Sequence, residues 1–319
     1  MKAVWRVREV STIAILVAEI IFFTWYLWPD GNRPHPFLNL DNALLILKYS
    51  SIYGIAAVGA AVVIISGGID LAPGAIIALA SVVCGYLFVE AGWPLNAAIP
   101  VALLVGAAAG GLSSVLIVAV KLPPFIATLG VMGITRGVAF ILTEGRYFDL
   151  SSRLIGGWRP LGLPADWVAP LVMIALAIVF QVLMTRFQWG RQIFSIGGNE
   201  TAALFSGVAI GRIKTSVYVL SGVLAAVAGV VLALVQGQGK ADLATGYELD
   251  IIASAVVGGA SLSGGRGSVL GAVLGTLIFG VLRNALPQIP GATFYDRLIV
   301  GLAVIVIVVM DQVLLKRGE

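Results

Sequence analysis

Five stretches of this chain carry no charged residue and are each close to or beyond the length that a helix needs to cross a membrane. They cover residues 49–69, 71–89, 91–120, 167–185 and 215–239. About 20 apolar residues in a helix span the hydrocarbon of a bilayer, whereas the strands of a membrane barrel alternate apolar and polar residues. Only 11% of the residues are charged, against about 25% in a soluble domain. The chain is therefore predicted to be all-α, a polytopic helical bundle in a membrane.

A single transmembrane domain of residues 1–319 with about ten spans accounts for the apolar pattern. The spans are expected at residues 10–28, 44–65, 72–89, 95–119, 124–143, 168–185, 216–236, 251–264, 268–284 and 296–313. The eighth and ninth are short for complete crossings, so the prediction covers eight to ten spans. The first apolar run is too long for a signal peptide and no small-residue cleavage site follows it, so we expect it to remain as a span.

Basic residues are distributed unequally between the two sides of this arrangement. With the N-terminus inside, eleven Lys and Arg residues face the cytoplasm and seven face the opposite side. Loops rich in Lys and Arg stay cytoplasmic in membrane proteins, so both termini are predicted to lie inside. The Lys and Arg residues are scattered among loops rather than clustered on one face. The net charge of +4 therefore does not indicate a nucleic-acid partner.

A helix-breaking decapeptide, SGGIDLAPGA at residues 66–75, separates two of the apolar runs. Asp70 is expected to cap the span that follows it, and Pro73 to occupy the first turn of that span. A related sequence, SGGRGSVLGA at residues 263–272, matches it at five of ten positions. Short segments interrupted by glycine mark transport paths, because unwound backbone survives at membrane depth only inside protein or beside water. The residues predicted to line or gate such a path are Gly67, Gly68, Asp70, Pro73, Gly264 and Gly265.

The two glycine turns leave alternatives open. Inverted halves of five spans would place them on opposite faces of the membrane, whereas the ten-span arrangement places both inside. Either the similarity between the two decapeptides is accidental or one short segment is re-entrant. An ordinary tight turn at the membrane surface is the alternative interpretation of the first turn. Elsewhere, glycines spaced four apart predict close helix packing, at Gly106 and Gly110, Gly133 and Gly137, and Gly267, Gly271 and Gly275.

The cytoplasmic loop at residues 186–215 contains the signals of a short helix. Asn199 is a favourable N-cap, Glu200 suits the first turn, and Gly207 can end the helix in the left-handed conformation. A helix of two turns is too short to be stable alone, so it must be held by packing. From these residues it is either an amphipathic connector or a docking element for a partner.

Five separate stretches, in the same order along the chain, carry a family resemblance. They are SGGIDLAPGA, LPPFIATLG with ITRG, IFSIGGNETAALFSGV, GYELD and VVGGASLSGGRGSVLGAVLG. Together they resemble the permease subunit of bacterial ABC importers for sugars of the ribose, xylose and galactose type, over nearly the whole chain. The wider superfamily includes permeases for branched-chain amino acids and for autoinducer-2, which remain alternative cargoes. The forms GGNETAALFSGV and SGGID favour a monosaccharide.

The resemblance implies a multi-pass protein of the bacterial inner membrane that works in a complex. The expected partners are a cytoplasmic ABC ATPase, a periplasmic sugar-binding protein and a second permease subunit, identical or related. The short helix corresponds to the family's coupling helix, with contact residues expected at Gly198, Asn199, Glu200, Ala202, Ala203, Ser206 and Gly207. Its exposed small face is expected around Ala202, Ala203 and Ser206. The chain has no G-x-x-x-x-G-K-[ST] phosphate loop, so ATP hydrolysis is expected on a separate chain.

Two other classes of protein were weighed against an ATP-driven importer. Glu19 is the acid in the middle of a span, and an ion-coupled carrier would use such a group. A carrier usually needs a relay of them, so Glu19 is expected to be a packing residue. An intramembrane enzyme would need a nucleophile with a base, but the single histidine, His35, falls in an outer loop. No metal or cofactor is expected, and the single cysteine, Cys84, is expected to be a small packed hydrophobe.

Overall fold

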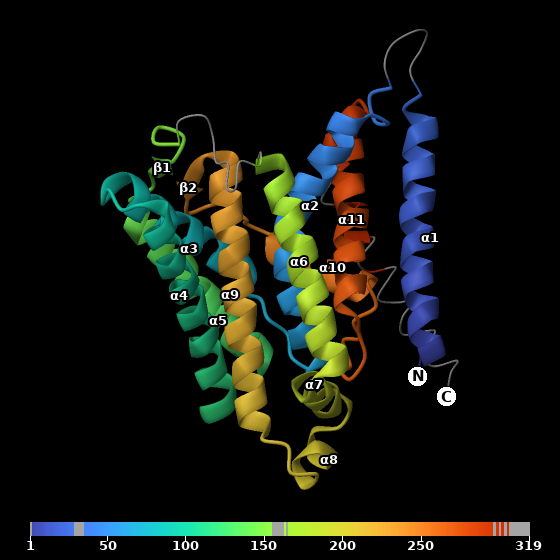
Figure 1. Cartoon of the computed structure of the whole chain (residues 1–319), viewed down its shortest axis with the longest axis vertical. Coiled ribbons are helices and arrows are strands. Elements are labelled where there is room, and N and C mark those ends of the chain that lie inside the picture. Colours follow the sequence, from blue (N-terminus) through green and yellow to red (C-terminus); the bar gives the residue numbers. More distant parts are fainter. Residues whose placement is uncertain are drawn as a thin grey trace.

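The computed structural model describes residues 2–28, 35–154, 163, 165–295 and five positions between 298 and 305. Within these residues the chain forms eleven α-helices and one sheet of two short strands (Figure 1). The helices are α1 (Lys2–Tyr26), α2 (Leu40–Ile65), α3 (Pro73–Gly85), α4 (Leu95–Ser114), α5 (Pro124–Thr143), α6 (Ala165–Arg186), α7 (Gln188–Gly198), α8 (Glu200–Phe205), α9 (Ile210–Gln236), α10 (Tyr247–Val257) and α11 (Val269–Ala285). The strands β1 (Tyr147–Asp149) and β2 (Gln238–Lys240) pair antiparallel, with Phe148 opposite Gly239. The predicted all-helical bundle is confirmed except for this sheet.

Seven of the described helices are long and apolar enough to cross a membrane. They are α2, α3 extended by the π-helical turn Tyr86–Glu90, α4 extended by Val115–Ala119, α5, α6, α9 and α11 extended by the 3-10 turn Leu286–Gln288. Helix α1 adds the shorter apolar segment Val10–Tyr26. Eight predicted spans therefore correspond to observed helices, because the length of an uncharged run is a local property. The expected span at residues 296–313 lies largely outside the described residues.

Two expectations about the helices were wrong. The predicted span at residues 251–264 is replaced by α10, which has only eleven residues and cannot cross a bilayer of about 30 Å at 1.5 Å per residue. The inner loop was expected to hold one short helix, but α7 precedes it. Helix α7 was missed because its apolar residues are separated by charged and polar ones, as in a helix that lies along a surface.

The short helices α7 and α8 and the two-stranded sheet lie at opposite ends of the helical bundle. Helix α1 begins at the end of the bundle that carries α7 and α8, and the sheet of β1 and β2 lies at the other end (Figure 1). We refer to these as the α8 end and the sheet end. Helix α10 starts inside the bundle and leads toward the α8 end, where a loop returns the chain into α11.

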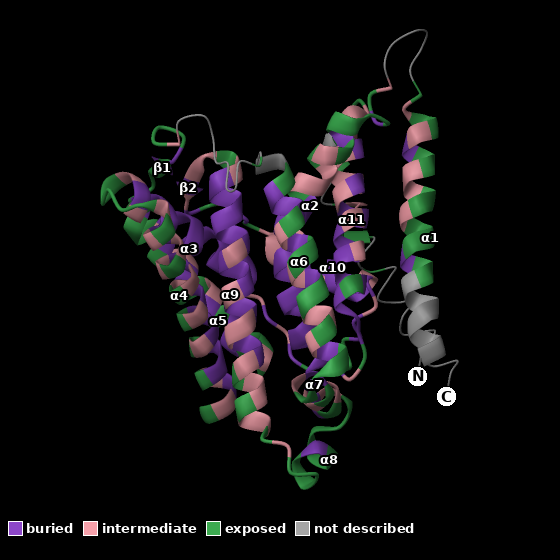
Figure 2. Ribbon diagram, viewed as in Figure 1, coloured by how far each residue is buried: buried purple, intermediate pink, exposed green. Residues whose placement is uncertain are grey.

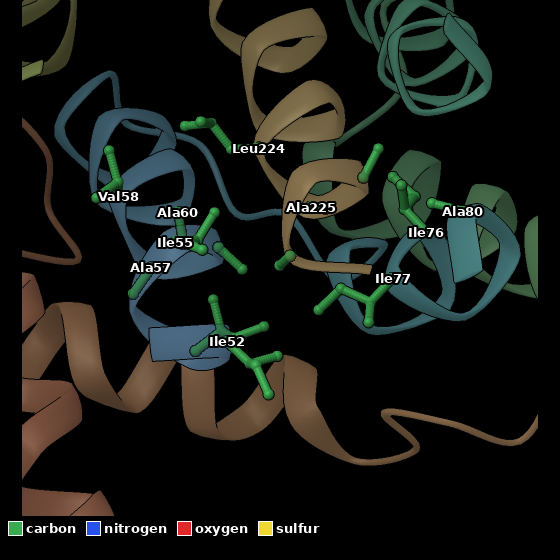
Figure 3. Packing of buried hydrophobic residues seen from close by; sticks show 14 of the residues in the cluster. Ile52, Ile55, Ala57, Val58, Ala60, Ile76, Ile77, Ala80, Leu224 and Ala225 are labelled. Atoms are coloured by element: carbon green, nitrogen blue, oxygen red, sulfur yellow. The ribbon is translucent and has the colours of Figure 1, made fainter. Parts of the chain in front are cut away.

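The core lies around α2 and α9, which are buried along most of their length, whereas α5 and α6 face outward (Figure 2). Figure 3 shows its centre, where side chains from α2, α3 and α9 interdigitate. The labelled residues are Ile52, Ile55, Ala57, Val58, Ala60, Ile76, Ile77, Ala80, Leu224 and Ala225. Many are small, and small residues let helix backbones approach closely within a membrane.

Two of the three predicted glycine seams are confirmed. Added Cβ atoms on Gly106 and Gly110 would overlap carbonyl oxygens of α9, and those on Gly271 and Gly275 would overlap carbonyl oxygens of Gly258 and Ser254. The third expectation fails within this chain, because a Cβ on Gly133 or Gly137 would meet nothing within 4 Å among the described residues. These two glycines lie on α5, which faces outward.

Candidate functional site

The broken segment at residues 66–72 connects α2 to α3 without helical structure beyond its first turn. Gly67 turns the chain with φ +83°, a value that favours glycine. The unwound backbone is held by neighbouring helices: the hydroxyl of Thr128 on α5 accepts a hydrogen bond from the amide of Leu71 at 3.2 Å. Part of the non-helical backbone is therefore satisfied by a protein side chain, the arrangement that unwound backbone needs at membrane depth.

Asp70 is buried in this segment, with 3% of its surface exposed. One carboxylate oxygen accepts the amide hydrogen of Ala72 at 3.0 Å, and the other accepts the hydroxyl hydrogen of Ser221 on α9 at 2.7 Å. Pro73 occupies the start of α3, as expected. The carboxylate was expected to cap α3 itself, but it binds the amide of the residue before the helix, so it holds the entry to α3 and ties it to α9.

Tyr218 lies beside the same segment. It is 1% exposed, and its hydroxyl has no hydrogen-bond partner within the part of the chain that the structure describes. A Cβ on Gly68 would overlap that hydroxyl. Gly68 is therefore required for close approach to α9, whereas Gly67 is required for the turn.

The two glycine turns and the C-terminal end of α7 meet at the α8 end, backbone against backbone. The amide of Gly265 donates a hydrogen bond to the carbonyl oxygen of Ile65 at 2.9 Å. A Cβ on Gly264, whose φ is +78°, would lie 2.7 Å from the carbonyl oxygen of Gly197 and 3.0 Å from the Cα of Gly67. A Cβ on Gly265 would lie 2.7 Å from the Cα of Gly198. We call the set Gly67, Gly197, Gly198, Gly264 and Gly265 the glycine junction.

The junction bears on the two related decapeptides. Their turns lie in contact at the same end of the bundle, and α10, which leads into the second turn, is too short to span a membrane. Both turns lie at one end, as the ten-span arrangement expects. The chain passes from the sheet end to the α8 end through α10, so α10 does not show the return to one side that defines a re-entrant segment. The contribution of Gly197 and Gly198 was missed, because nothing in the residues near them indicates which distant turns they touch.

A single residue, Asn199, separates α8 from α7. The side chain of Asn199 accepts the amide hydrogen of Ala202 at 2.9 Å, and Gly207 takes φ +80°. The predicted cap and the predicted left-handed end are therefore both present. Lys214 and Glu200 form an ion pair of 2.7 Å that connects α8 to α9.

The predicted face of α8 needs a correction. Ala203 is 1% exposed, because it faces back toward the chain, so it cannot belong to an exposed docking face. Ala202 and Ser206 are exposed as expected. The large exposed side chains are Leu204 at 58% and Phe205 at 86%. The prediction of a face of small residues missed one signal, the two adjacent apolar residues Leu204 and Phe205 in this short helix.

Two ionisable side chains, Glu19 and His35, lie away from the glycine junction. The Oε2 atom of Glu19 on α1 is buried and has no hydrogen-bond partner within the described residues. His35 accepts the amide hydrogen of Leu38 at 2.8 Å and stacks edge-on against Trp28, so it organises its loop. Cys84 is buried, as predicted. In the described part of the chain no group of three or more His, Cys, Asp and Glu residues is arranged to hold a metal ion.

Comparison with known proteins gives consistent matches. Residues 42–309 match the family model described as "Branched-chain amino acid transport system / permease component". The chain is 35% identical to the ribose import permease protein RbsC of Escherichia coli (strain K12), over 97% of this chain and 94% of that protein. It is 33% identical to the D-allose transport system permease protein AlsC of the same strain, over 89% and 87%. It is 32% identical to the xylose transport system permease protein XylH, also of that strain, over 96% and 92%. No solved structure matches the chain.

Proposed function

The chain belongs to the family of branched-chain amino acid transport system permease components, and on that premise we propose that it is the membrane-spanning permease of a bacterial ATP-driven importer for a monosaccharide. As a permease component it is a transport subunit. The similarity to permeases for ribose, D-allose and xylose over nearly the full length of each chain supports a sugar cargo. A branched-chain amino acid, named in the family description, and autoinducer-2 are the alternative cargoes.

We propose that the chain crosses the membrane about ten times with both termini in the cytoplasm. The α8 end is then cytoplasmic and the sheet end is periplasmic. The excess of Lys and Arg in the loops assigned to the inside supports this orientation. In this arrangement α10 and the irregular backbone before it together make one crossing, from the sheet end to the α8 end. The last span falls largely outside the described residues.

The observation that carries the mechanism is the glycine junction. Helix α8, the proposed coupling helix, is separated from Gly198 only by its N-cap, Asn199. Gly197 lies against both glycine turns, and Gly198 lies against the turn at Gly265. A movement of α8 by an ATPase would therefore act directly on the turns after α2 and α10. We propose that these turns, with the broken segment, gate the inner end of the transport path: Gly67, Gly68, Asp70, Pro73, Gly264 and Gly265.

The proposed partners follow from the same geometry. An ATPase would receive α8 through Phe205 and Leu204, with Ala202, Ser206, Glu200 and the turn at Gly207 around them. A sugar-binding protein would dock at the sheet end. A second permease subunit, identical or related, would pack against the outward face of α5, where Gly133 and Gly137 are open.

Uptake by cells tests the proposed function. The gene is deleted from its bacterium, and uptake of labelled D-ribose, D-allose, D-xylose and leucine is measured with and without the gene restored. We expect cells with the restored gene to take up one of the sugars again. This uptake should stop when cellular ATP is depleted while the proton gradient is kept. Recovery of leucine uptake alone would support the amino acid alternative. Uptake that followed an imposed ion gradient without ATP would favour a carrier and direct attention to Glu19.

A further inference from the structure

Four polar side chains from three helices form a cluster between the junction and the sheet end. Tyr53 of α2 and Tyr247 of α10 stack with ring centroids 4.3 Å apart and planes at 29°. Arg283 of α11 lies over the Tyr53 ring at 5.7 Å and donates to Asp250 of α10 at 2.7 Å. None of these residues belongs to the glycine junction.

The cluster lies at membrane depth. Tyr53 precedes Ile65, the residue of α2 that contacts the junction, by twelve positions, which corresponds to about 18 Å along a helix. A bilayer's hydrocarbon is about 30 Å thick, so the cluster lies in its outer half if the α8 end is cytoplasmic. Charged side chains at that depth are costly and mark substrate pathways by preference. The Arg283 side chain also remains 32% exposed, so the cluster is not sealed in the core.

The backbone that leads into the cluster is irregular. Between β2 and α10 the chain passes through Ala244 with φ +55° and Gly246 with φ +87°. Arg136 of α5 holds this stretch by donating to the carbonyl oxygens of Ala241 and Leu243, both at 2.7 Å. Irregular backbone at membrane depth is tolerated inside protein or along a water-filled cavity.

Glu248 follows Tyr247 in α10 and interacts electrostatically with Arg136 of α5. Its Oε2 atom is buried and has no hydrogen-bond partner within the described residues. A Cβ on Gly74 would overlap that oxygen, so the carboxylate lies against the first turn of α3. The positive end of a helix favours a carboxylate there, and the free oxygen can still accept a hydroxyl.

We propose that Tyr53, Tyr247, Glu248, Asp250 and Arg283 form a sugar-contact site on the outer half of the transport path, an inference that rests on the proposed function. Sugars present an apolar C–H face that packs on aromatic rings and a rim of hydroxyl groups. Carboxylates accept from those hydroxyls, and a guanidinium donates to them with charge-assisted strength. A mostly apolar bundle with a few convergent polar groups is the usual composition of a small-molecule site.

Cysteine labelling tests whether water and sugar reach the site. In a Cys84→Ala background, Glu248→Cys is treated from the outside with an impermeant cationic methanethiosulfonate in cells that contain the whole importer. The thiolate is the reactive form, so a thiol in lipid or in a sealed core does not react. We expect labelling, slowed by whichever of D-ribose, D-allose or D-xylose these cells take up. Ile134→Cys, exposed on the outer face of α5, should stay unlabelled.

A kinetic measurement gives an independent readout. Glu248→Gln removes the charge, including its attraction to Arg136, while keeping the shape of the side chain. It should lower the maximal uptake rate by about tenfold, the effect of one charged hydrogen bond. Glu90→Gln, at the exposed end of the turn after α3, is the matched control and should transport normally. The inference is overturned if Glu248→Cys is as unreactive as Ile134→Cys, or if Glu248→Gln transports at the parental rate, while the parent still imports the sugar. If the parent imports no sugar, the proposed function itself has failed.

Discussion

The amide of Gly265 donates a hydrogen bond of 2.9 Å to the carbonyl oxygen of Ile65, although the two residues belong to opposite halves of the chain. This bond ties the end of α2 to the turn before α11. Gly197, at the end of α7, packs against the same two turns, and only Gly198 and Asn199 separate it from α8. The end of α7, next to α8, is therefore in direct contact with both breaks in the bundle.

The junction predicts a strong effect of a single methyl group. Gly264→Ala places a Cβ 2.7 Å from the Gly197 carbonyl oxygen at a positive φ, whose strain alone costs about 1 to 2 kcal/mol. Gly92→Ala is the matched control, because Gly92 has φ +73° and a Cβ there would meet nothing within 4 Å of the described residues. We expect Gly264→Ala to abolish uptake and Gly92→Ala to retain it. Equal uptake by both variants in cells would contradict a role for the contact.

Asp70 predicts a graded loss of stability. Asp70→Asn keeps an acceptor for one of its two bonds, whereas Asp70→Leu leaves the amide of Ala72 and the hydroxyl of Ser221 without the partner that they have here. A buried polar group left unsatisfied costs about 1 to 3 kcal/mol. The melting temperature of the purified protein should fall in the order parent, Asp70→Asn, Asp70→Leu. Ser221→Ala, which removes one bond, should resemble the milder variant. Identical melting temperatures would show that these bonds do not hold the break.

Substitutions at exposed and buried residues of α8 are predicted to have different effects, one on binding of the ATPase and the other on stability of the permease. Phe205→Ala removes the most exposed large side chain of α8 and should reduce association with the ATPase at least tenfold without changing membrane insertion. Phe125→Ala, also exposed but on α5, should leave association unchanged. Ala203→Arg should instead lower the stability of the permease alone, because burying an unpaired charge costs several kcal/mol. Normal ATPase binding by Phe205→Ala in pull-down measurements would contradict docking through this face.

The glycine seams predict different outcomes for two similar substitutions. Gly110→Leu would drive a side chain into the backbone of α9 at Tyr218 and should destabilise the monomer by at least about 1 to 3 kcal/mol. Gly133→Leu points into open space in this chain and should leave monomer stability unchanged. If a second permease packs on α5, Gly133→Leu should weaken the dimer in size-exclusion measurements. A dimer that is unaffected by Gly133→Leu would place the interface elsewhere.

Local patterns in the sequence determined most of the bundle. Uncharged runs set the long helices, Asn199 and Gly207 set the two ends of α8, and Gly67 with Pro73 set the break between α2 and α3. Each of these features depends on residues within a few positions of one another, because helix length, capping and backbone conformation are local.

Only the tertiary structure decided which of these local features meet. The hydrogen bond between Asp70 and Ser221, the contact of Gly264 with Gly197, and the stacking of Tyr53 on Tyr247 all join segments far apart in the chain. The same holds for Ala203, whose side chain is buried because of how α8 lies on its neighbours. A span carries an apolar surface on several sides, so its hydrophobic pattern does not select its neighbour, and packing of small residues makes that choice.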